Sequence, residues 1–273
     1  MITTIKDSLN LWGFAPAKLP VKLGLAPHNA PKILANSIPK SGTHLLERLL
    51  YLLPCISRQF ARTFHVQEAV PFERRCARLK QGQFLVCHLY FQEEYLRILE
   101  DHDIKPVFLI RDPRDVLLSY INYITRINLK HPLHRHFAHH LKSDKERLHF
   151  CMRGSQQPHH DTIAEMLGKF YPWTRSAQVL TVRFRDLIGE AGGGSARVQR
   201  RTVDSILNFI GVNLEEKKKG ALISQIYHPR SKTFHRGQID QWKKRYDDED
   251  IKIFKDIAGD WLIKYGYETG YDW

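Results

Sequence analysis

The stretch with the clearest chemistry is residues 33–43, which read Ile-Leu-Ala-Asn-Ser-Ile-Pro-Lys-Ser-Gly-Thr. An apolar run leads into a loop that holds Lys40, and leucines then recur at helical spacing over 44–53. This pattern predicts a strand, a loop and the start of a helix. Free N–H groups at a helix N-terminus bind anions, and a neighbouring lysine adds a full positive charge. Because the glycine-rich GxxxxGK[ST] run of nucleotide hydrolases is absent, the sequence predicts a phosphate-binding loop but not an ATPase.

A second cationic corner follows another apolar run, residues 107–110. Arg111 ends this run, Asp112 suits the N-cap of the next helix, and Pro113 suits its first position. Arg111 should therefore lie at the carboxyl edge of the sheet, where open α/β folds bind ligands. Ser119 follows about two helical turns later and can point back to the same crevice. An arginine and a hydroxyl suit a phosphate, and a salt bridge of Arg111 is the ordinary alternative.

A third basic loop lies late in the chain, where Phe234, His235, Arg236 and Gly237 precede Trp242. Glycine permits a tight turn, so backbone N–H groups together with Arg236 can surround a phosphate. Alone, such a loop is more often a solvated basic turn. Its place after two other candidate anion sites favours a binding role.

The elements that must hold these residues are those of an α/β fold. Near-continuous apolar strands that alternate with helices predict a central parallel sheet flanked by helices on both faces. The chain of 273 residues is long enough for a single domain over 31–273, after an irregular extension over 1–30. The expected strands are 33–36, 84–88, 107–110 and 179–184, and the expected helices are 44–53, 203–210 and a C-terminal helix with Phe254 and Trp261.

Residues 125–160 differ in composition, because they are polar, rich in histidine and weakly periodic. Histidine clusters can bind a metal ion, but no HExxH motif and no histidine–cysteine ligand pattern occurs here. We therefore expect a mobile insertion over an active site rather than a metal centre.

Composition restricts the partners and the compartment. The formal charge of +13 should attract polyanions, which include nucleic acid, anionic lipid, acidic glycan and nucleotides. The four cysteines have no CxxC spacing, which predicts buried free thiols in the reducing cytoplasm. No segment approaches the ~18 apolar residues of a spanning helix, and the N-terminus does not read as a signal peptide. We expect no stable membrane insertion, with a peripheral membrane contact left open.

Taken together, residues 39–43, Arg111 with Ser119, and the Arg236–Gly237 loop before Trp242 resemble the sulfotransferase family, whose fold is P-loop-like. These enzymes move a sulfuryl group from 3′-phosphoadenosine 5′-phosphosulfate (PAPS) to a hydroxyl or amine and release 3′-phosphoadenosine 5′-phosphate (PAP). The resemblance covers about residues 33–265, and it implies a reaction that requires no metal ion.

The resemblance assigns a role to each motif. The first loop holds the 5′-phosphosulfate, the second motif holds the 3′-phosphate, and the third loop adds contacts to the 3′-phosphate. The implied donor-binding residues are Lys40, Ser41, Gly42, Thr43, His44, Arg111, Ser119, His235, Arg236 and Gly237.

The catalytic residues follow from the same resemblance. Residues 84–89 are similar to the Lys-Thr-His-Leu segment of the family, whose histidine is the general base. This implies that His88 accepts the acceptor proton while Lys40 neutralises charge on the departing nucleotide. Carbohydrate-type members use a glutamate instead, for which Glu93 or Glu94 would be the candidates, and a histidine at a strand end is otherwise a structural residue.

Several positions depart from the phenol-type members of the family. His44 and Leu45 replace Thr-Trp, Val86 replaces the lysine before the base, and His235 replaces an arginine. Phe184 stands where many members have a tyrosine. These changes argue against the phenol-type subfamily but leave the donor prediction unchanged.

Two other functions share some of these features. A P-loop-type kinase has the same strand–loop–helix, but its lysine follows a glycine. A nucleic-acid-binding protein would suit the charge, but no RNP, zinc-finger or homeodomain signature occurs, so we expect no nucleic-acid partner. The acceptor is a small molecule, a glycan or a lipid, and residues 54–82 and 125–175 should form its walls. Its candidate aromatic residues, each of which core packing explains equally well, are Tyr90, Phe91, Tyr120, Tyr123, Phe137 and Trp173.

Overall fold

The computed structural model describes residues 21, 25–59, 63–65, 67–227 and 237–273. Most of the expected extension over 1–30, including its candidate helix, lies outside the described residues. The strands are β1 (Lys32–Ser37), β2 (Ser57–Arg58), β3 (Gln83–Cys87), β4 (Ile104–Ile110) and β5 (Leu180–Arg183). The α-helices are α3 (Thr43–Leu52), α4 (Ala69–Ala77), α5 (Glu93–Asp101), α6 (Pro113–Asn122), α7 (His134–His139), α8 (Asp144–Arg153), α9 (Ile163–Phe170), α10 (Phe184–Leu187), α11 (Ala196–Ile210), α12 (Glu216–Ile226) and α13 (Asp248–Lys264).

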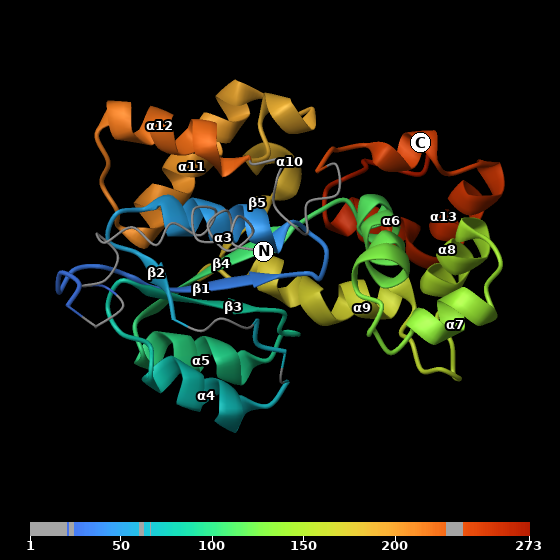
Figure 1. Cartoon of the computed structure of the whole chain (residues 1–273), viewed down its shortest axis with the longest axis horizontal. Helices are drawn as coiled ribbons and strands as arrows, with labels where there is room; N and C mark the ends of the chain where they lie inside the picture. The colour runs from blue at the N-terminus through green and yellow to red at the C-terminus, as the bar shows by residue number, and fades with distance from the viewer. Residues whose placement is uncertain (1–20, 22–24, 60–62, 66, 228–236) are drawn as a thin grey trace, which may run out of the picture.

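The five strands form one parallel sheet in the order β2-β3-β1-β4-β5, as the predicted fold class requires. β1 lies in the middle, and the chain builds β2 and β3 on one side of it before β4 and β5 on the other (Figure 1). The carboxyl end of β1 is therefore the point where the strand order reverses. Open α/β sheets bind their ligands at such a point.

Helices cover both faces of the sheet. In Figure 1, α3, α11 and α12 lie above it, and α4 and α5 lie below it. Side chains alternate along the strands, so that Leu34 and Phe108 belong to one core cluster and Ile33 and Val107 to the other. Burial on both faces explains why these strands appear in the sequence as continuous apolar runs.

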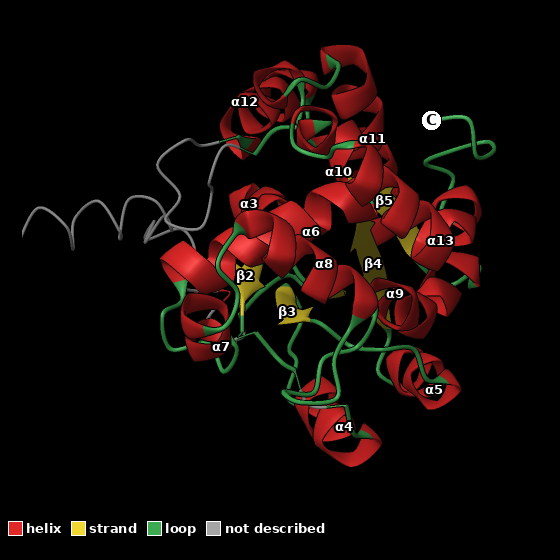
Figure 2. Ribbon diagram, turned by 90° about the vertical axis from the view of Figure 1, so that its right-hand side faces the viewer, coloured by secondary structure: helices red, strands yellow, loops and turns green. Residues whose placement is uncertain are grey.

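The third group of helices stands beyond the carboxyl ends of the strands. Figure 2 shows α6, α8 and α9 in front of the sheet, with α13 beside them. Part of this group comes from residues 125–160, which form α7 and α8 with Phe137, Leu148 and Met152 buried in the core. The segment is therefore helical and packed into the domain, and its mobility stays a prediction.

Two histidines of that segment, His149 and His136, make contacts with neighbouring side chains. His149 Nε2 lies 2.7 Å from Asp250 Oδ1, and the His136 ring lies 5.0 Å from the Phe150 ring. Among the described residues, no three histidine, cysteine or carboxylate side chains are grouped in a way that could hold a metal. Their helices are too short to give a clear apolar period in the sequence.

Several expected boundaries were wrong by small amounts. The expected strands 84–88 and 179–184 each end one residue early, so that His88 follows β3 and Phe184 opens α10. The expected helix 203–210 is only the apolar second half of α11, which begins at Ala196 after the N-cap Ser195. The expectation that all cysteines are buried fails for Cys55, which is exposed, whereas all four are free thiols. No helix among the described residues is long and apolar enough to cross a membrane.

A buried arginine ties the start of α6 to the C-terminal segment. Arg114 is 2% exposed, donates two hydrogen bonds to Asp112 (2.9 and 2.7 Å) and pairs with Glu268 at 2.6 Å. Its guanidinium lies 3.7 Å from the centre of the Trp242 ring and 4.4 Å from that of Trp273. These contacts fix the corner from which Arg111 and α6 project.

We expect Arg114→Ala to lower the free energy of unfolding by about 3 kcal/mol, because it leaves two carboxylates without their buried cation. Urea denaturation of the variant and the wild type measures this difference. Arg153→Ala, at an exposed position on α8, is the control. Equal losses in the two variants would show that the buried ion pairs do not hold this corner.

Candidate functional site

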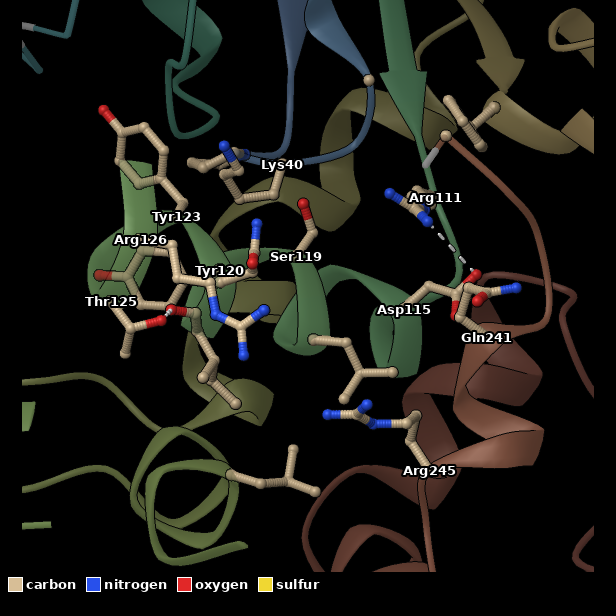
Figure 3. A pocket seen from close by; sticks show the side chains of 18 of the residues that line it. Lys40, Arg111, Asp115, Ser119, Tyr120, Tyr123, Thr125, Arg126, Gln241 and Arg245 are labelled. Carbon is tan, nitrogen blue, oxygen red and sulfur yellow. Dashed lines mark hydrogen bonds and ion pairs between the residues drawn. The ribbon is translucent and has the colours of Figure 1, made fainter. Parts of the chain in front are cut away.

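A cavity of about 860 Å³ opens where the predicted motifs meet (Figure 3). Its walls come from the loop after β1, the residue after β3, the corner after β4, helix α6 and the segment that begins at Gly237. Ser41 is buried behind the loop, whereas His235 and Arg236 lie outside the described residues. The predicted residues that line the cavity are Lys40, Gly42, Thr43, His44, His88, Arg111, Ser119 and Gly237.

The loop after β1 has a backbone shape that depends on glycine. Gly42 has φ 93°, and a Cβ atom there would lie 2.3 Å from a ring carbon of Phe184. Gly42 is also the N-cap of α3 and provides no side-chain cap, so the first N–H groups of the helix stay available to an anion. Lys40 likewise has a positive φ, 70°, beside this helix start.

Two buried polar atoms around the loop have no hydrogen-bond partner among the described residues: Ser41 Oγ and Arg111 Nε. Buried polar groups in native proteins are nearly always paired, so these two atoms are available to a partner such as a bound anion or water. Both are donors, which fits an oxyanion. The residues present therefore fit a phosphorylated ligand.

Lys40 and Arg111 face the same cavity. The Lys40 Nζ atom lies 3.8 Å from the centre of the Tyr123 ring. Burial, and then the positive charge of Arg111, lower the pKa of Lys40 to about 8. Each cation therefore raises the free energy of the other, and a bound anion would relieve that repulsion.

Arg111 makes a salt bridge, which the sequence also allowed in place of phosphate binding. Its Nε atom nevertheless has no hydrogen-bond partner among the described residues. Arg111 Nη2 lies 3.5 Å from Asp115 Oδ2 and donates to the carbonyl oxygen of Gln238 at 2.9 Å. The guanidinium also stacks 4.6 Å from the centre of the Phe184 ring. Asp115 in turn accepts a hydrogen bond from the backbone N–H of Trp242 at 3.0 Å. This buried carboxylate, which the sequence analysis did not single out, connects the second motif to the segment that carries the third.

His88 is held in one orientation by its neighbours. Sheet register pairs Asn36 with Cys87, so His88 lies beside Ser37. The His88 Nδ1 atom is 2.8 Å from the Ser37 carbonyl oxygen, which can only accept, so Nδ1 carries the proton and donates. Nε2 is therefore left with its lone pair free to accept a proton.

The surroundings keep that imidazole neutral. The pKa of His88 is lowered to about 4, and burial is the largest cause. The hydrogen bond to Ser37 opposes this shift, whereas the nearby His65, His44 and Lys40 lower the pKa further. His65, another residue that the sequence analysis missed, has its ring 5.0 Å from that of His88. At neutral pH His88 is therefore unprotonated, as a general base must be, and in the free protein it is a weaker base than an ordinary histidine.

The alternative bases and most of the proposed aromatic wall lie elsewhere. Glu93 and Glu94 are exposed in the first turn of α5 and are not among the described residues that line the cavity. Tyr120 and Tyr123 do line it. Phe137 and Trp173 are fully buried in the core, and Tyr90 and Phe91 pack against that core.

Comparison with known proteins agrees with this geometry. A family model described as a sulfotransferase domain matches residues 30–266. The fold is similar to that of a mouse sulfotransferase, SULT7A1, solved with PAP (TM-score 0.60, 13% identity, 94% of each chain covered). It is also similar to retinol dehydratase solved with retinol and PAP (TM-score 0.56, 14% identity, 91% of this chain and 86% of that one). A further structure of retinol dehydratase, with androsterone and PAP, gives a TM-score of 0.57 at 15% identity and covers 90% of this chain and 85% of that one.

No curated protein matches the chain by sequence. The family model nevertheless spans most of the 273 residues, and the structures share the sheet and its flanking helices. The predicted family and its P-loop-like fold are thereby confirmed: this chain belongs to the sulfotransferase domain family and is a transferase.

Proposed function

We propose that this sulfotransferase moves the sulfuryl group of PAPS to an acceptor hydroxyl and releases PAP. The observation that carries the proposal is the meeting of Lys40, Arg111 and a neutral His88 in one cavity at the carboxyl end of β1. Membership of the family supports it, and so do the solved neighbours, which contain PAP. An amine could replace the hydroxyl, because His88 can accept a proton from either.

Two groups of residues around the cavity would bind the two charged ends of the donor. Lys40, the N–H groups at the start of α3 and the unpaired Ser41 hydroxyl would hold the phosphosulfate. Arg111 and Ser119 would hold the 3′-phosphate, because the forked N–H donors of an arginine fit the oxygen atoms of a phosphate. We also propose that His235, Arg236 and Gly237 belong to this end, since Gly237 lines the cavity next to the Gln238 carbonyl that Arg111 contacts.

The chemistry requires a base and a fixed positive charge. PAPS supplies the sulfuryl group, whose bond to the phosphate oxygen breaks as a bond to the acceptor oxygen forms. His88 takes the acceptor proton at Nε2, while Ser37 holds Nδ1 in place. Lys40 neutralises the charge that develops on the departing phosphate, a form of preorganised electrostatic stabilisation.

The acceptor is proposed to be a small molecule that lies against Tyr120 and Tyr123. Both rings line the cavity, and the neighbouring structures contain retinol and androsterone, each of which carries a hydroxyl on an apolar frame. A glycan or lipid acceptor is the second candidate, favoured by the basic residues of the same walls. We place the enzyme in the cytoplasm, because its cysteines are free.

Ligand-induced stabilisation tests the donor. PAP should stabilise the protein by about 2.7 kcal/mol at one hundred times its dissociation constant, whereas ATP with Mg²⁺ and duplex DNA should not. Arg111→Ala should weaken PAP binding tenfold or more, and Arg153→Ala should leave it unchanged. Transfer of label from ³⁵S-PAPS to an alcohol panel then tests the reaction itself. Stabilisation by ATP with Mg²⁺ and not by PAP would contradict the proposal in favour of a kinase.

The pH profile tests His88 as the base. Because its pKa is lowered to about 4, the base is deprotonated throughout the range from about pH 5 to 7. We expect kcat/KM for the acceptor, measured with PAPS saturating so that the titration of free PAPS does not contribute, to stay level over that range and to fall only as the pH drops towards 4. His88→Ala should lack turnover at every pH while keeping its affinity for PAP. A fall of kcat/KM centred near pH 6.5 would contradict the assigned environment of the base.

A further inference from the structure

Three cationic side chains that line the cavity, Arg126, Lys145 and Arg245, have no role in donor binding or proton transfer, and Arg126 is the one considered first. Arg126 belongs to the π-helical turn η2 (Tyr123–Ile127), which continues α6. Figure 3 shows its guanidinium pointing into the cavity. Arg126 is exposed, and no hydrogen-bond or ion-pair partner of its side chain occurs among the described residues. A π-helical turn of this kind is frequently found at functional sites.

The carboxylates of the cavity wall are already engaged with other groups. Asp144 Oδ1 pairs with Arg147 at 2.8 Å, and Asp247 Oδ2 accepts from Lys145 at 2.6 Å. Asp250 Oδ1 lies 2.7 Å from His149 Nε2. The charge of Arg126 is therefore not compensated by the described wall.

A second guanidinium reinforces the first. Arg245 also lines the cavity, and in Figure 3 its guanidinium points towards Arg126 from the segment before α13. The Arg245 side chain is 57% exposed, and its one ion-pair partner among the described residues is Asp144 Oδ2, 3.6 Å away. The same carboxylate also pairs with Arg147. Two arginines that point into the same space from different elements make an oxyanion site, because each offers a planar fork of donors.

This site is separate from the donor phosphates. Arg126 follows Ser119 by seven residues, which corresponds to about 10 Å along a helix. It shares its turn with Tyr123, whose ring contacts Lys40 at the proposed point of sulfuryl transfer. In the proposed reaction the acceptor oxygen lies near this point, from which the rest of the acceptor can extend towards Arg126.

We propose that the acceptor carries a carboxylate and that Arg126, supported by Arg245, binds it. The inference rests on the proposed function, and it narrows the acceptor to an alcohol or phenol that also bears an acid group. A neutral alcohol would leave Arg126 solvated by water, whereas a carboxylate gains a charge-assisted hydrogen bond from it.

A matched pair of probes tests the site. 4-Hydroxyphenylacetate and 4-hydroxyphenylacetamide differ only in the anion, and calorimetry with the PAP-saturated protein gives their dissociation constants. We expect the carboxylate to bind about tenfold more tightly than the amide, as one charge-assisted hydrogen bond predicts. In Arg126→Gln this preference should fall to near one, with amide and PAP affinities unchanged, and Arg245→Gln should reduce it partly.

Lys130→Gln is the matched control, because Lys130 is exposed near η2 and is not among the described cavity-lining residues. It removes the same charge and should keep the preference. Equal binding of the two probes, or binding of neither by a protein that binds PAP, would overturn the inference. A loss of PAP affinity in Arg126→Gln would also overturn it, by assigning Arg126 to the donor. Failure of the wild-type protein to bind PAP would instead refute the proposed function.

Discussion

The structure depends on the placing of two like charges in one cavity. Lys40 and Arg111 come from loops after neighbouring parallel strands. Burial, and then the charge of Arg111, lower the pKa of Lys40 to about 8. Tyr123, Phe184 and Asp115 compensate part of this cost through aromatic and ionic contacts. A bound anionic donor would offset the remaining repulsion between the two cations. The relief of this repulsion would then contribute to the free energy of donor binding.

Other buried residues hold His88, the loop after β1 and the corner after β4 in position by hydrogen bonds and packing. Buried Asn36 holds the backbone of Leu89 through two hydrogen bonds, 2.9 and 3.1 Å, and Trp173 Nε1 donates to the same carbonyl at 2.8 Å. These contacts fix the residue just before Leu89, which is His88. The packing of Phe184 on Gly42 and the enclosure of Arg114 by two tryptophan rings fix the loop and the corner in the same way.

Local sequence was sufficient for the parts of the site that local physics determines. The strand–loop–helix at Lys40 and the corner at Asp112 and Pro113 follow from apolar runs and capping, and the Asp112 cap is present. Contacts between distant parts of the chain could not be predicted in this way. Strand β2 has only two residues, too few for a pattern, and Asp115 is recognised only through its hydrogen bond with Trp242. Arg126 reaches the cavity because α6 continues as η2, which no local pattern indicates. The packed helices of 125–160 were missed because short histidine-rich segments carry little period.

The central claim is that Lys40 binds the donor as a cation in competition with its own burial, and the affinity for PAP between pH 7 and 10 tests it most directly. Since the pKa of Lys40 is about 8 in the free protein, PAP affinity should be level below that value. It should then fall by up to tenfold per pH unit above it. Lys40→Arg, which stays protonated over this range, should bind PAP with no such fall. A wild-type affinity that does not change between pH 7 and 10, or a Lys40→Arg variant that keeps the same decline, would contradict the account.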